Sequence, residues 1–148
     1  MSDCLQATEA DKKNEAKWKL RAAIFDRDEQ TVTQLCSEGT VDVNEKLDSV
    51  VNAAPTPLAY ASSYCHGGVM RALLRAGANP NGLTDDYGNT CLHLAVALGH
   101  ANDSDRKEAI QILLAAGASK TARDSDGCTP AASAAWKKMG GDIVAMLQ

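Results

Sequence analysis

The middle of the chain has the hydrophobic pattern of two short helices in succession. Leu92, Ala95 and Val96 recur at helical spacing and predict an apolar stripe on the first helix. Apolar residues within 107–116 predict a second helix, and Gly117 can take the left-handed conformation that ends it. Each helix would bury one face only, so the pair needs neighbours of the same kind on both sides.

The same pattern recurs along the chain. With Leu92 as the reference position, a repeat protein of this type should have copies about 33 residues away. Matching stretches lie around Leu20, Leu58 and Ala131. Three positions after each reference stands an alanine, as expected where helices of adjacent copies approach closely: Ala23, Ala61, Ala95 and Ala134.

A second column of residues tests the same alignment. Apolar residues stand twelve and fifteen positions after Leu20, Leu58 and Ala131, and eighteen and twenty-one positions after Leu92, where a polar interruption intervenes. In each pair a spacing of three places both members on one helical face. We expect these pairs to form a continuous core through the stack. They are Val32 and Leu35, Met70 and Leu73, Ile110 and Leu113, and Ile143 and Met146.

The third copy also has turn and capping residues. Asp86 and Gly88 predict a tight turn, and the Thr90 hydroxyl can cap the following helix. The run Thr90-Cys91-Leu92-His93, with Gly99-His100 after it and Gly117-Ala118 at its end, resembles an ankyrin repeat, although Cys91 stands where the family has Pro. The resemblance implies an all-α ankyrin-repeat solenoid of about four helix-turn-helix repeats with β-turn fingers, similar to small stand-alone four-repeat proteins.

The expected organisation is a polar N-terminal cap segment, 1–16, followed by an ankyrin-repeat domain, 17–148. Thr8 and Asp11 are expected to start the cap helix by side-chain capping. The spacing between copies is uneven, and the extra residues within 45–55 and 101–106 are expected in surface loops. The repeats themselves are expected at approximately 17–47, 48–82, 83–121 and 122–148.

Composition narrows the class of protein. The chain has 148 residues, of which 45% are apolar and 23% charged, which suits one compact domain. It has no apolar run of the roughly 18 residues that span a bilayer and no signal-peptide pattern at its start. Its five scattered cysteines favour reduced thiols. We therefore expect a soluble cytoplasmic or nuclear protein that does not act at a membrane.

Charge and chemistry-bearing residues favour neither nucleic-acid binding nor catalysis. The net charge is −4, whereas phosphate binding needs a concentrated basic face. Cys65, His66 and His100 occupy equivalent turns of neighbouring repeats and leave a zinc-dependent enzyme or sensor as an alternative, but no Cys-x-x-Cys or His-x-x-x-His spacing supports it. We interpret them as surface side chains without a ligand. We expect no metal, no cofactor and no enzymatic activity.

The resemblance to ankyrin repeats implies two further expectations. In that family the His of the Thr-x-Leu-His step, here His93, bonds to the backbone of neighbouring turns and ties repeats together. The family also binds protein partners through a concave face made by the fingers and the first helix of each repeat. The residues that this implies as partner-binding are Phe25, Ser63, Asp86, Tyr87, Asn89, Ala97, Ser125, Asp126 and Trp136.

Aromatic anchors among small and acidic residues are typical of an interaction surface. The partner is expected to be a protein of unknown identity. Another interpretation of Phe25 and Trp136 is that they cover the ends of the core. A further alternative for the whole chain is a structural or self-associating ankyrin fragment of a larger assembly.

The C-terminal repeat is the basis of that alternative. Between residues 129 and 148 only Lys137, Lys138 and Asp142 are ionic, although a terminal repeat should present one face to water. Weak self-association through this repeat is therefore expected as a possibility alongside the binding of a foreign protein.

Overall fold

The computed structural model describes residues 8–47, 56–82, 88–97 and 101–148. Within these ranges the chain forms eight helices and no strand, so the all-α prediction is confirmed. In chain order the helices are α1 (Glu9–Phe25), α2 (Glu29–Ser37), α3 (Pro57–Ser63), α4 (Gly67–Arg75), α5 (Cys91–Ala97), α6 (Asp103–Ala115), α7 (Pro130–Trp136) and α8 (Gly141–Leu147).

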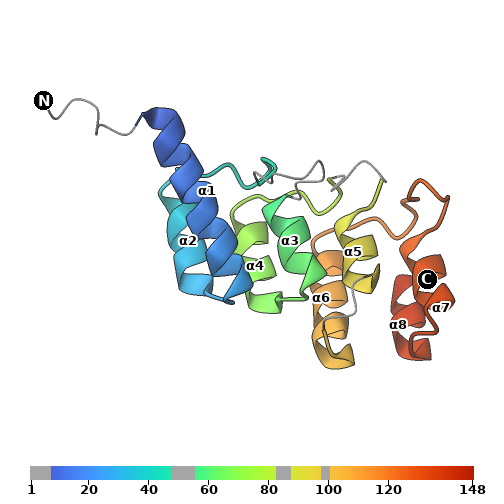
Figure 1. Ribbon diagram of the computed structural model, residues 1–148. Helices are drawn as coiled ribbons and strands as arrows, with labels where there is room; N and C mark the ends of the chain where they lie inside the picture. Colours follow the sequence, from blue (N-terminus) through green and yellow to red (C-terminus); the bar gives the residue numbers. More distant parts are fainter. Residues whose placement is uncertain (1–7, 48–55, 83–87, 98–100) are drawn as a thin grey trace, which may run out of the picture.

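The helices stack in two rows, which is the architecture of a helix-turn-helix solenoid (Figure 1). The first helices of the pairs form one row, in which α1 contacts α3, α3 contacts α5 and α5 contacts α7. The second helices form the other row, in which α2, α4, α6 and α8 contact one another in turn. Each first helix also packs on its own second helix, so every pair buries its apolar faces against its neighbours.

Short polar side chains fix the starts of the helices. Thr56 and Thr129 each accept a bond from the backbone N–H three residues ahead, at 3.3 and 3.2 Å, and proline takes the next position. At the first helix the Thr8 hydroxyl accepts from Asp11 N at 3.1 Å, and Thr8 N donates to the Asp11 carboxylate at 2.9 Å. This reciprocal capping confirms the predicted start, and α1 then continues without a break into the first repeat.

The expected loop at 101–106 is wrong, because α6 already begins at Asp103. The Asn102 side chain accepts from Asp105 N at 2.8 Å and caps the helix. Two aspartates in the first turn also suit the positive end of the helix dipole. Arg106 is buried and donates to Ala95 O at 3.2 Å, which fastens this added turn to α5. The other expected loop lies largely outside the described residues, at 48–55.

The predicted core columns are confirmed with one exception. Ala23, Ala61, Ala95 and Ala134 are all buried, as are seven of the eight residues in the apolar pairs. The exception is Met146, which is only partly buried, whereas Leu147 is buried beside Ile143. Residues 143 and 147 are four apart and therefore share the inner face of α8.

The turns inside the helix pairs have a left-handed residue at equivalent positions. Arg27, Cys65 and Lys138 have φ values of 60°, 54° and 56°. The turns that follow the second helices instead have glycine in this conformation, and Gly117 has the predicted positive φ, 92°. The turns inside the first, second and fourth helix pairs thus share this left-handed conformation, although the residue types differ.

Polar side chains join neighbouring repeats near the fingers. Asn44 donates to Gly77 O at 3.1 Å and accepts from Asn79 N at 2.8 Å. Asn81 makes the same two bonds one repeat further on, to Gly117 O and Ser119 N, at 3.0 and 2.7 Å. These side chains satisfy backbone groups of the next unit and so fix the distance between repeats.

Candidate functional site

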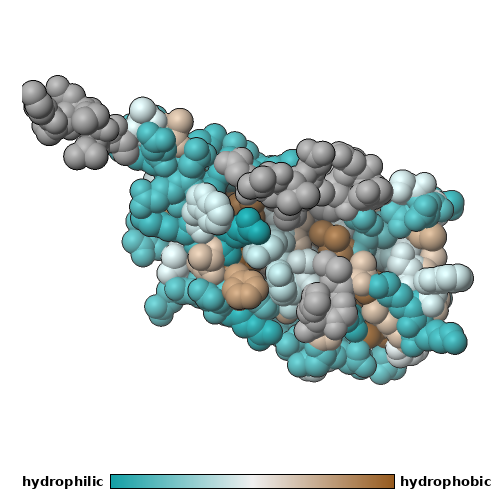
Figure 2. Space-filling view, viewed as in Figure 1, coloured by the Kyte–Doolittle hydropathy of each residue, from teal (hydrophilic) through white to brown (hydrophobic). Residues whose placement is uncertain are grey.

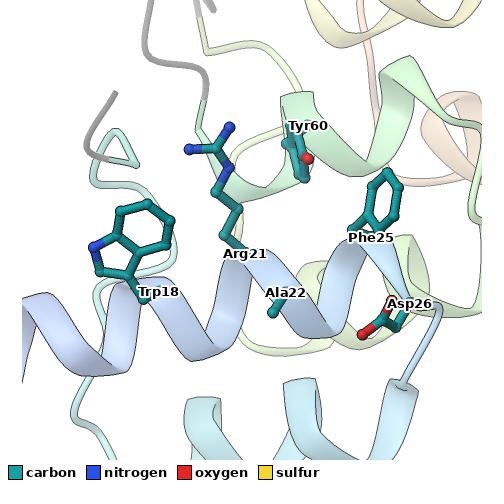
Figure 3. Close-up of a pocket in the computed structure, with 6 residues that line it drawn as sticks. All are labelled: Trp18, Arg21, Ala22, Phe25, Asp26 and Tyr60. Carbon is teal, nitrogen blue, oxygen red and sulfur yellow. The ribbon is translucent and has the colours of Figure 1, made fainter. Parts of the chain in front are cut away.

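The candidate site is a groove between α1 and α3, on the row of first helices (Figure 3). It encloses about 350 Å³. Figure 3 shows Trp18, Arg21 and Phe25 rising from α1, with Arg21 extending toward Tyr60 of α3. We call it the α1/α3 groove, and its lining residues are Trp18, Arg21, Ala22, Phe25, Asp26 and Tyr60.

The local sequence of α1 explains why the groove is open. Trp18, Arg21 and Phe25 are three and four residues apart, so they share one face of the helix. Leu20 and Ile24 lie on another face and are fully buried in the stack. Trp18 is left 63% exposed and Phe25 57% exposed. The space-filling view shows hydrophobic surface beside hydrophilic surface over α1 and α3 (Figure 2).

Ring contacts hold the walls of the groove in place. Tyr64 meets Phe25 edge to face at 5.7 Å between ring centroids, and it meets Tyr60 similarly at 5.3 Å. Burial, together with the neighbouring Tyr60, raises the pKa of Tyr64, so its phenol is neutral at pH 7. Aromatic contacts thus connect the end of α1 to α3 and limit how far the groove can change shape.

The residues predicted from the helix columns lie in different environments. Phe25 lines the α1/α3 groove. Ser63 is only 8% exposed and its hydroxyl donates to Tyr60 O at 2.7 Å, so we leave it out of the site. Ala97 is half-buried, and its carbonyl accepts from Lys137 Nζ. Trp136 is 88% exposed and lies two repeats away from the groove.

The predicted finger residues are distributed along another part of the stack. Asp86 and Tyr87 lie outside the described residues, and Asn89 is half-buried. Ser125 and Asp126 are exposed on the last finger. That finger is held by the Asp124 carboxylate, which accepts from the backbone N–H groups of residues 126 and 128 at 3.0 and 2.9 Å. Asn89, Ser125 and Asp126, the finger residues that the structure describes, do not line the groove that contains Phe25.

Sequence reasoning missed five of the six residues that line the groove, namely Trp18, Arg21, Tyr60, Ala22 and Asp26. For the first two a signal exists, since they precede Phe25 by seven and four positions and so fall on its helical face. The prediction compared equivalent positions in successive repeats. It did not compare the residues that share one face of α1. Tyr60 has no comparable signal, because its place opposite Arg21 depends on how α3 packs on α1.

A polar cavity of about 240 Å³ lies at the turns between the helix pairs. Its charges are compensated internally, because Arg27 pairs with Asp105 at 3.4 Å and Arg71 pairs with Glu108 at 2.8 Å. His66 lines it and shares a 2.8 Å hydrogen bond between its Nδ1 and Ile24 O. These contacts hold repeats together and leave little unpaired charge for a ligand.

Cys65 and His66, two of the three turn residues considered for zinc, are buried, which corrects the expectation of surface side chains for these two. Cys65 is 2% exposed, and burial raises its pKa to about 11. His66 is also buried, because its ring packs toward Ile24 and bonds its carbonyl. His100 lies outside the described residues. Across the described ranges no three His, Cys, Asp or Glu side chains are grouped as a metal ion would need.

His93 ties repeats together, as expected. Its Nε2 lies 2.8 Å from Cys128 O of the next finger. Its Nδ1 lies 2.9 Å from the Thr90 hydroxyl. Because a carbonyl only accepts, Nε2 donates and Nδ1 is left as the acceptor.

Among the helices of the described part of the chain, none is both long and apolar enough for a membrane crossing.

Comparisons with known proteins agree with the architecture. Human neurogenic locus notch homolog protein 4 is 41% identical over 81 residues, a stretch equal to 54% of this chain and 4% of that protein. The chain thus spans a small part of that relative's length. A family model described as ankyrin repeats in three copies matches residues 20–124, and α7 and α8 add a fourth helix pair beyond that range. The chain therefore belongs to the ankyrin-repeat family.

Proposed function

We propose that the chain is a non-catalytic module that binds a protein partner through the α1/α3 groove. Ankyrin repeats are generally protein-interaction modules and are typically non-catalytic. The observation that supports this groove is the exposure of Trp18 and Phe25 on either side of Arg21. Tryptophan and arginine are enriched among the residues that dominate binding energy, and aromatic residues in general are enriched at interfaces.

The size of the groove suits one or two side chains of a partner. A binding interface buries about 800 Å² on each side, so neighbouring surface must also take part. Asn89, Ser125 and Asp126, on the fingers of the third and fourth repeats and away from the groove, are candidates for further polar contacts with a partner that extends along the stack. We further propose that binding takes place in the cytoplasm or nucleus, which the free thiols of Cys36, Cys65, Cys91 and Cys128 support.

The test compares the parent chain with two variants, one double and one single, each in the full chain. Trp18→Ala and Phe25→Ala together should weaken binding of the natural partner by at least about 2 kcal/mol, because both truncate exposed anchors of the groove. Trp136→Ala is the matched control, since it removes an exposed aromatic side chain from another repeat. Partners captured from source cells by the parent chain would then be titrated against each variant.

The outcomes separate the groove from the wider surface. The circular dichroism spectrum should be the same for all variants, since the rings of Trp18, Phe25 and Trp136 are exposed and do not belong to the buried core. If the double variant retains full affinity while Trp136→Ala loses it, the partner binds at the fourth repeat and the proposed groove is wrong.

A second candidate function is self-association through the fourth repeat. Trp136 is 88% exposed, and Ala132 and Ala135 are exposed on the same helix. An exposed tryptophan among small residues suits a weak contact with a second copy. Sedimentation at increasing concentration should detect a dimer of the parent, and Trp136→Ala should abolish it. A parent chain that remains monomeric at high concentration would contradict this candidate.

A further inference from the structure

Arg21 occupies a special position in the α1/α3 groove. Its guanidinium carbon lies 5.7 Å from the centre of the Trp18 ring and 5.6 Å from that of Tyr60. Ring contacts of this kind use the faces of the guanidinium group. Its N–H donors lie in the plane of the group and point outward from the edge. They are therefore placed to bind a planar acceptor that enters the groove.

Arg21 differs from the lysines of α1, whose charges are compensated by carboxylates. Every lysine of α1 forms an ion pair with a carboxylate at 3.4 Å or less: Lys12 with Glu9, Lys13 and Lys17 with Glu45, and Lys19 with Glu15. Among the described residues, Arg21 forms no ion pair with a carboxylate. Its guanidinium contacts the rings of Trp18 and Tyr60 instead. The groove thus offers one positive charge with unused hydrogen-bond donors.

The two ends of the α1/α3 groove differ in the side chains that they present to a ligand. Trp18 lies at one end of the groove and Phe25 and Asp26 lie at the other, at the end of α1, with Arg21 and Tyr60 between the two ends (Figure 3). The Asp26 carboxylate would repel a second acidic group at that end. The Phe25 ring there offers apolar surface to a ligand. A ligand that fits therefore places its acid near Trp18 and an apolar group near Phe25.

We infer that the α1/α3 groove selects a protein segment in which an Asp or Glu is adjacent to a bulky apolar residue. The carboxylate binds the edge of Arg21 through two N–H donors, and the apolar side chain packs on Phe25. This inference rests on the proposed function and states which class of partner the groove accepts. A basic segment is disfavoured, because the charge of Arg21 repels a second cation beside the two rings.

The experiment is a specificity screen of the full chain with an immobilised array of random peptides. The parent should retain peptides with Asp or Glu next to Leu, Met or Phe. Arg21→Gln should weaken the best such peptide by about tenfold or more, since it loses a charge-assisted bidentate contact. Arg21→Glu should reverse the preference toward Lys or Arg. Lys19→Gln removes the same charge from α1 outside the groove and should leave both preference and affinity nearly unchanged.

The readouts distinguish the inference from the proposed function. If Phe25→Ala abolishes binding but Arg21→Glu still prefers acidic peptides, the groove binds partners and the acidic selection is wrong. If neither variant changes any peptide's affinity while both keep the parent's helicity, the proposed groove is wrong as well. If the free parent is a dimer and Arg21→Glu makes it a monomer, the groove is a contact between copies and the inference is overturned.

Discussion

At the scale of single residues, function and stability depend on side chains that lie only a few positions apart. Trp18 and Phe25 on α1 are exposed, whereas Leu20 and Ile24 between them are buried. The left-handed turn residues also differ in burial. Cys65 is buried in the stack, whereas Lys138 is exposed in the equivalent turn of another repeat. Outside the core columns, equivalent positions therefore differ in burial from one repeat to the next.

His66 gives the chain a predicted dependence on pH. Burial, as the largest cause, lowers the pKa of His66 below its ordinary 6.5, and the nearby Arg27 lowers it further, although the bond to Ile24 O and the Asp105 charge oppose the shift. The unfolded chain then takes up the proton at a higher pH than the folded chain. Stability is full above about pH 6.5 and falls as the pH drops below it, by at most about 1.4 kcal/mol per unit.

The measurement is urea unfolding at several pH values between 7.5 and 5.5. His66→Gln keeps a donor for Ile24 O and has no titrating group, so its urea midpoint should fall less over this range than that of the parent. The carboxylates with lowered pKa values, such as Asp28 and Glu45, titrate below this window. Equal slopes for parent and variant would contradict the assignment to His66.

At the scale of elements, α6 shows that a polar segment can belong to a helix. The segment after residue 100 reads as a loop by hydropathy, yet Asn102 caps it and Arg106 fastens it to α5. The side chain of Arg106 is buried among the helices while its guanidinium bonds Ala95 O and Asp103. The extra residues of the third repeat therefore lengthen its second helix toward the polar cavity at the turns.

Asn102→Ala should destabilise the chain by about 1 kcal/mol, because it leaves the first backbone N–H groups of α6 without their cap. Asp103→Ala is the control, because its carboxylate is 72% exposed in the pair with Arg106. Arg106 is buried but keeps its bond to Ala95 O when Asp103 is truncated, so we expect a smaller loss there. The free energies of unfolding from urea titrations would be compared. A larger loss for Asp103→Ala would show that the ion pair, and not the cap, holds this end.

At the scale of the whole molecule, the stack depends on the alanines that separate adjacent first helices. Ala61 and Ala95 have no exposed surface, and α3 and α5 meet there. No repeat can move apart from its neighbour without exposing apolar residues of both. The repeats therefore stabilise one another, and the α1/α3 groove keeps its shape only while α1 and α3 stay packed.

Ala95→Leu should destabilise the stack by about 1 to 3 kcal/mol, since a larger side chain must push the first helices apart. Ala145→Leu on α8 is the matched control, because Ala145 is exposed and tolerates the same change. Urea midpoints measure both. An unchanged midpoint for Ala95→Leu would contradict the alignment of the repeats.

The sequence by itself determined the repeated architecture. Three local patterns recur along the chain: the apolar pairs, the alanine column and the capping threonines. Each favours the same helix pair wherever it recurs. For this reason the all-α stack, the buried Ala95 and the positive φ of Gly117 were all predictable. The tie between His93 and the next finger followed from the family resemblance.

Tertiary structure decided which residues converge on a surface. Tyr60 faces Arg21 because α3 packs on α1, and no periodicity within either helix contains that relation. The burial of Cys65 and His66 was likewise set by neighbouring repeats, which cover turns that read as exposed in a single repeat. Distances between repeats are properties of the packed stack. A groove shared by two repeats therefore emerges only when both are in place.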